Sequence, residues 1–213
     1  MLDWLGREGD ELRMAFGRVF DRRQRPFGNR PSRVGGVSDG NEGVQWNAAY
    51  DPRNGRRWIG VNLEGLKYAS WPIARLISRE LRDPTLPQFI GDATDPARAE
   101  ILWKRDYWQV ASRPPILEGN ISPTPILLQR LTEQAWREAL EQARDCLEQT
   151  KSGWKRAKQE VTLARSGQRV LGDVSPHLTL IYPDDGTLPW EDFFIEAKQM
   201  MQPYYDWVAE RSA

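Results

Sequence analysis

The stretch from Val44 to Gly65, VQWNAAYDPRNGRRWIGVNLEG, constrains the fold more than any other part of the chain. Two strand-like runs flank the segment Asp51-Pro52-Arg53-Asn54-Gly55, and Asn-Gly is the strongest short turn signal known for a β-hairpin. The sequence therefore predicts two antiparallel strands joined by a tight turn.

Helical spacing of apolar residues appears in four other segments. The sequence predicts helices over residues 10–21, 71–82, 125–151 and 190–210, with Pro72 in the first turn of the second helix.

Residues 22–43 are rich in Arg, Gly, Pro and Asn and predict a loop. A short helical start at Asp95-Pro96 is expected to lead into a strand over residues 101–111. Alternating residues from 160 to 183, broken by Ser166-Gly167 and Gly172-Asp173, predict two or three antiparallel strands. The fold class is α+β.

The best candidate for a domain boundary is the Pro-rich connection SRPPILEGNISPTP. It separates residues 1–112, a helix-hairpin-helix half with the Arg-rich loop, from residues 124–213, with the long helix, a meander and the last helix. A similar plan in the two halves is one expectation, although they share no obvious sequence identity, and one compact domain overall is the alternative.

Composition excludes several classes of protein. Hydrophobic residues at 39% and charged residues at 28% are typical of a soluble globular protein. No run approaches the ~20 apolar residues that a membrane-spanning helix needs, and the start of the sequence lacks the features of a signal peptide. Cys146 and His177 are the only residues of their types, so Cys/His zinc sites and internal disulfides are excluded. Cys146 is expected to be structural or a bystander. A cytoplasmic location follows as an expectation.

Pro183-Asp184 and Glu196-Ala197-Lys198 spell the letters of a Mg²⁺-dependent nuclease site. In that architecture the Glu and the Lys lie on a strand, where residues two apart point to the same side. Here the apolar residues after Trp190 recur at intervals of three and four, which predicts a helix. On a helix Glu196 and Lys198 lie roughly 200° apart and cannot share a metal ion.

A second set of carboxylates offers an enzymatic alternative. It is a Mg²⁺-dependent nuclease or phosphodiesterase built around Glu64, with Mg²⁺ as cofactor; the residues are Asp51, Glu64, Lys67, Glu80 and Asp106. Along an ideal hairpin Asp51 and Glu64 lie on the order of 20 Å apart, so another carboxylate would have to join Glu64. The spacing is not specific for any metal.

Arginine is concentrated near the hairpin. Between Gly17 and Arg57 nine basic residues face four acidic ones, a local balance of nine minus four, or +5. The guanidinium fork suits phosphate groups, and a face that carries arginines together with Trp46 and Trp58 could hold nucleic acid. The candidate residues are Arg22, Arg23, Arg25, Arg30, Arg33, Arg53, Arg56, Arg57 and Trp58. The alternative is that these arginines pair with acidic groups of the chain and that both tryptophans lie in the core.

The leading hypothesis is a non-enzymatic cytoplasmic protein that acts through binding, as a subunit or accessory factor of a larger assembly. It rests on the scarcity of catalytic side chains and on the ten tryptophans, because Trp and Arg are favoured anchors of interfaces. A protein partner or a homo-oligomer is expected and nucleic acid is a possible further partner, DNA and RNA both remaining open. No metal site, cofactor or membrane contact is expected under this hypothesis.

Overall fold

A computed structural model describes the fold of residues 2–28, 34–40, 43–64, 72–92, 98–109, 117–120, 126–149, 158–162, 169–184 and 186–213. The predicted helical start at Asp95-Pro96 lies outside these residues, as does most of the Pro-rich connection. No helix among the described residues has the length and apolar character required to cross a membrane.

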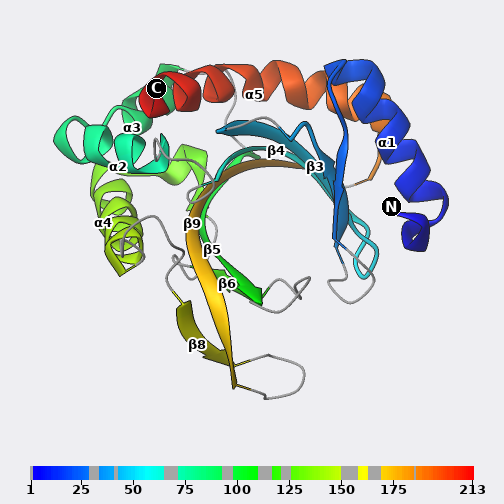
Figure 1. The fold of residues 1–213 in the computed structure, drawn as a ribbon. Coiled ribbons are helices and arrows are strands. Elements are labelled where there is room, and N and C mark those ends of the chain that lie inside the picture. The colour runs from blue at the N-terminus through cyan, green and yellow to red at the C-terminus, as the bar shows by residue number, and fades with distance from the viewer. Residues whose placement is uncertain are drawn as a thin grey trace.

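One antiparallel sheet forms the centre of the fold (Figure 1). Its strands are β1 (Arg25–Phe27), β2 (Gly35–Ser38), β3 (Val44–Asp51), β4 (Arg56–Glu64), β5 (Glu100–Gln109), β6 (Leu117–Asn120), β7 (Ile126–Leu127), β8 (Lys158–Thr162) and β9 (Arg169–Asp184). They run in the order β1-β2-β3-β4-β9-β5-β6, with β7 beside β5 and β8 beside β9. Because β9 lies between β4 and β5, strands from the two ends of the chain share this sheet.

The helices cover one side of the sheet. They are α1 (Arg7–Phe20), α2 (Pro72–Arg82), α3 (Leu86–Asp92), α4 (Glu133–Gln149) and α5 (Trp190–Ser212), with short 3₁₀ helices η1 (Asp3–Leu5) and η2 (Leu128–Arg130). Figure 1 shows a strongly curved sheet with these helices on its convex side, where α5 arches between α1 at one end and α2 and α3 at the other. The predicted α+β class is confirmed.

Aromatic rings fill the space between α1, α5 and the sheet. Trp46 of β3 stacks on Tyr205 of α5 with ring centroids 5.1 Å apart. Phe20 of α1 lies 5.1 Å from Trp46 and 6.3 Å from Phe194 of α5 by the same measure. Such rings bury a large apolar area, and this packing holds the two long helices against the sheet.

The part of the nuclease-like segment that carries Glu196 and Lys198 is helical, as predicted, whereas Pro183-Asp184 end strand β9. Of its predicted core residues, Phe194, Ala197 and Met201 are completely buried and Tyr204 is 2% exposed. Glu196 accepts hydrogen bonds from Arg98 and Tyr182, whereas Lys198 donates to the carbonyl oxygen of Val19 on another side of the helix. Glu196 and Lys198 therefore serve separate structural contacts.

Four sequence-based assignments are wrong. The predicted loop over residues 22–43 contains β1 and β2, because pairing of β2 with β3 and of β1 with β2 imposes an extended conformation on a segment of low strand propensity. The helix predicted from residue 125 begins at Glu133, since residues 126–127 pair with β5 and the Thr132 hydroxyl accepts from the N–H of Ala135 as a cap. Helix α3 was not predicted. The expected break at Gly172-Asp173 is absent, because β5 and β8 pair with β9 on either side of that point.

Candidate binding face

Alternation along the hairpin sorts its side chains onto two faces of the sheet. Trp46, Ala48, Ile59 and Val61 belong to the hydrophobic core beneath the helices. Since successive residues of a strand point to opposite faces, the residues between them lie on the concave face. We call the concave side of β1, β2, β3, β4 and β9 the helix-free face, because no helix among the described residues lies against it (Figure 1).

The floor of the helix-free face carries uncharged hydrogen-bonding side chains. Gln45, Asn62 and Thr179 lie side by side on β3, β4 and β9, and the Thr179 hydroxyl donates to Asn62 Oδ1 at 2.8 Å. All three are buried, as is His177, two residues before Thr179. Burying polar groups costs free energy unless they form hydrogen bonds. A row of buried polar side chains is therefore unusual on a sheet face against which no other described element packs.

Asn47 occupies the next row of the same face. In that row Ser38, Asn47, Gly60 and Ile181 are aligned on β2, β3, β4 and β9. The Oδ1 atom of Asn47 is buried and has no hydrogen-bond partner within the described chain. An unpaired buried carbonyl of this kind costs about 1–3 kcal/mol. The sequence and fold therefore maintain an amide here whose carbonyl oxygen contributes no hydrogen bond to the described fold.

Two glycines allow the sheet to curl around this face. A Cβ atom at Gly36 would lie 2.6 Å from Cζ of Phe27, and one at Gly60 would lie 2.8 Å from the carbonyl oxygen of Leu180. No real side chain fits at such separations. Glycine within a strand commonly marks a tight bend, so Gly36 and Gly60 favour the concave shape of the helix-free face.

A row that contains two aromatic rings crosses the same face. Phe27, Gly36, Ala49 and Trp58 are aligned on β1, β2, β3 and β4. Neither Phe27 nor Trp58 packs in the hydrophobic core, and both are half-buried. The expectation that Trp46 and Trp58 share a face is wrong, because the hairpin register places Trp46 opposite Val61 in the core and Trp58 on the other side.

The structure divides the predicted arginine surface into several groups. Three exposed or half-exposed arginines form ion pairs on strand ends or nearby loops: Arg22 with Asp39 at 2.8 Å, Arg53 with Asp51 at 2.5 Å and Arg56 with Glu100 at 2.9 Å. Arg30 and Arg33 lie outside the described residues. A hydrogen bond from Arg22 to the hydroxyl of Tyr205 raises the pKa of this arginine further, so it stays charged.

Arg57 differs from its neighbours because it is buried. Its guanidinium group forms an ion pair with Asp184 and lies 4.6 Å from the centre of the Trp190 ring. A buried cation with a charged and an aromatic partner serves the packing of α5 on the sheet. Arg57 is therefore a structural residue on the helical side.

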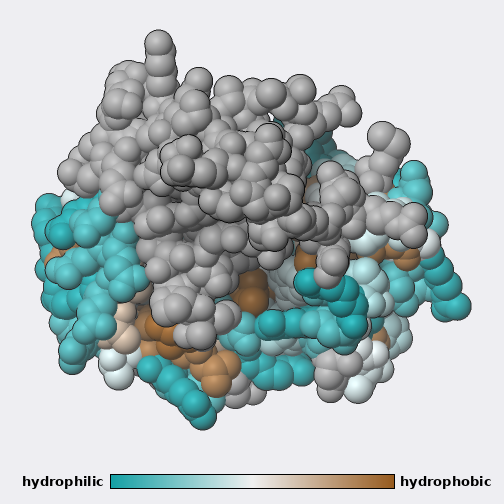
Figure 2. All heavy atoms as spheres, turned by 90° about the horizontal axis from the view of Figure 1, so that it is seen from below, coloured by the Kyte–Doolittle hydropathy of each residue, from teal (hydrophilic) through white to brown (hydrophobic). Residues whose placement is uncertain are grey.

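Arg23 and Arg25 are exposed and form no ion pair with any described residue. Arg25 lies at the edge strand β1, opposite Ser38, and therefore ends the row that contains Asn47. Its aliphatic stem lies across Gly40, where a Cβ atom would come within 2.9 Å of its Cγ. The stem is thus packed while the guanidinium group stays in solvent. Figure 2 shows that the described surface on this side of the molecule is largely hydrophilic, with small apolar areas between the polar ones.

The alternative carboxylate site is not assembled by the residues that can be placed. Asp51 ends β3 and pairs with Arg53, whereas Glu80 lies on α2 on the convex side. For Glu64 and Asp106 the structure gives backbone pairing, with His177 and with Ser175 respectively, and Lys67 lies outside the described residues. Within the described residues no three His, Cys, Asp or Glu side chains group as metal ligands do. The side chain of Cys146 is also outside the described set.

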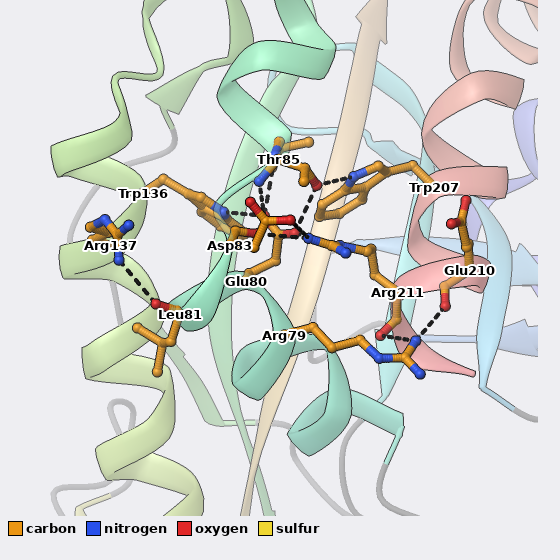
Figure 3. A network of polar contacts seen from close by, with 11 residues as sticks. Arg79, Glu80, Leu81, Asp83, Thr85, Trp136, Arg137, Trp207, Glu210 and Arg211 are labelled. Atoms are coloured by element: carbon orange, nitrogen blue, oxygen red, sulfur yellow. Dashed lines mark hydrogen bonds and ion pairs between the residues drawn. The ribbon is translucent and has the colours of Figure 1, made fainter.

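Glu80 has a structural role that sequence reasoning missed (Figure 3). Its completely buried carboxylate accepts hydrogen bonds from Thr85 Oγ1 at 2.8 Å, Trp136 Nε1 at 2.8 Å and Arg211 Nε at 2.6 Å, and from two backbone N–H groups at the start of α3. The donors come from α4, α5 and the segment that leads into α3. Because its oxygens already accept five hydrogen bonds, Glu80 ties four helices together and has little capacity left for a metal ion.

Comparisons with models of known protein families, with curated proteins and with solved structures find no match to this chain.

Proposed function

We propose that this protein acts by binding nucleic acid, as a non-enzymatic subunit or accessory factor of a larger assembly. One observation carries the proposal: a concave sheet face lined with uncharged amide and hydroxyl groups ends at edge strand β1, where Arg25 and the preceding Arg23 form no ion pair with a described residue. Amides both donate and accept hydrogen bonds, as the edges of bases do, and the guanidinium fork matches phosphate. A protein partner on another surface would complete the assembly, and the single cysteine supports a cytoplasmic location.

The experiment is fluorescence anisotropy with short labelled DNA and RNA over a range of salt concentrations. Each phosphate contact releases counterions, so log affinity falls with log salt by roughly 0.7 to 0.9 per contact. The double variant Arg23→Ala and Arg25→Ala should remove about two contacts and flatten the slope accordingly.

A matched control is the double variant Arg82→Ala and Arg130→Ala. Both arginines are exposed and form no ion pair with a described residue, but they lie on α2 and η2. We expect this control to leave the slope unchanged. Undetectable binding at low salt, or the same loss of slope in both double variants, would reject the proposed function.

A further inference from the structure

The helix-free face holds one tryptophan that the fold does not use in its core. Trp58 is half-buried, lies outside the hydrophobic core and makes no ring contact with another described residue. Trp46, which pairs with Val61 on the opposite face of the hairpin, stacks on Tyr205 instead. A large aromatic side chain that stays half-exposed on a concave polar face suits recognition of a planar ligand better than it suits packing.

Trp58 lies opposite Pro183 on its β9 side, whereas its neighbours toward β3 are small. Across the strands its row continues through Ala49 and Gly36 to Phe27, whose ring edge lies beside Gly36. Along β4 the next residue on the same face is Gly60. On this side two glycines and an alanine flank the indole ring, and they add little side-chain volume.

Asn47 lies diagonally from Trp58, since Trp58 pairs with Ala49 and Gly60 pairs with Asn47. Diagonal neighbours in an antiparallel pair are about 7–8 Å apart, within reach of one ligand. The Asn47 amide is half-buried with its Oδ1 unpaired among the described residues. A half-turn of the amide exchanges its donor and its acceptor, so this side chain can meet either kind of group on the edge of a base.

We infer that the nucleic acid is single-stranded and that one of its bases stacks on Trp58 while its edge meets Asn47. This inference rests on the proposed function and states which form of nucleic acid the helix-free face takes. In a duplex the faces of the bases are stacked on one another and their pairing edges are occupied, whereas a single strand offers both. The exposed Arg25 on edge strand β1, and Arg23 two residues before it in the chain, supply the positive charge for its phosphates.

The test compares a labelled single strand with the same sequence annealed to its complement. We expect the single strand to bind more tightly. Stacking on one aromatic ring contributes about 1–3 kcal/mol, so Trp58→Ala should weaken single-strand binding roughly 5- to 150-fold at every salt concentration, with an unchanged salt slope. Trp58→Phe, which keeps a ring, should recover most of the affinity.

A second variant guards against loss of folding in Trp58→Ala. Asn47→Asp keeps the shape of the side chain and places a negative charge beside the base, so single-strand affinity should fall while Thr179→Val, in the next row, changes it less. Equal affinity for duplex and single strand, together with unchanged binding by Trp58→Ala and Asn47→Asp, would overturn this inference and leave the proposed function standing. Absence of binding to any oligonucleotide would instead reject the proposed function itself.

Discussion

Tyr204 illustrates how a single buried hydroxyl group affects stability. The residue is 2% exposed, and its hydroxyl has no hydrogen-bond partner within the described chain. Burial disfavours the charged phenolate and raises the pKa of Tyr204 to about 12 from its ordinary value of 10.0. The unfolded chain therefore loses this proton first as the pH rises. Stability from this group is complete below pH 10 and declines between about pH 10 and 12.

We predict that Tyr204→Phe removes this decline. Below pH 10 the variant should be as stable as the parent protein or slightly more stable, because an unpaired buried hydroxyl is lost. Above it, the parent should lose up to about 1.4 kcal/mol per pH unit relative to the variant. Denaturant unfolding of both proteins at a series of pH values gives the comparison, which cancels the titration of other groups. Parallel pH profiles would contradict the prediction.

At the scale of elements, Glu80 connects helices that are far apart in the sequence. Glu80→Gln keeps the size of the side chain but removes the nearer charged partner of Arg211, which keeps only the exposed Asp83 at 3.7 Å among the described residues, and turns an amide NH₂ toward existing donors. Breaking a buried ion pair on one side costs about 3–5 kcal/mol, so the urea midpoint of unfolding should fall markedly. Glu210→Gln, an exposed change on the same helix as Arg211, should stay within about 0.5 kcal/mol of the parent. Similar midpoints for the two variants would show that the network around Glu80 is dispensable.

The elements that the sequence predicts well are those with a strong local signal. The Asn54-Gly55 turn and the apolar spacing of α1, α2 and α5 appear in the structure with small shifts at their ends. Strands β1 and β2 carry no such signal, because Gly35 and Gly36 are present for close packing against Leu5 and Phe27 rather than for strand propensity. The Thr132 cap of α4 was a local signal, and the helix was nevertheless predicted to begin at residue 125.

The candidate site could be predicted in part. The turn register alone places Asp51 opposite Arg56, and counting outward from that pair separates Trp46 from Trp58 onto opposite faces. Which of the two faces is covered depends on where α1 and α5 pack, and this depends on contacts between distant parts of the chain. The ion pairs of Arg22 and Arg57 are likewise long-range, so a tally of charge along the sequence cannot separate paired arginines from Arg23 and Arg25, which form no ion pair with a described residue.

For the whole molecule, thermal stability distinguishes the proposed binding protein from the Mg²⁺-dependent enzyme. Any ligand that binds only the folded state raises the melting temperature, and a ligand at a hundred times its dissociation constant adds about 2.7 kcal/mol. For a domain of this size that corresponds to roughly 5–10 °C. We predict such a rise with a single-stranded oligonucleotide at low salt, and none with Mg²⁺ or Mn²⁺ alone. A rise with either metal ion that disappears in Glu64→Gln would instead favour a nuclease or phosphodiesterase built around Glu64, because that variant removes a carboxylate ligand with little change in size.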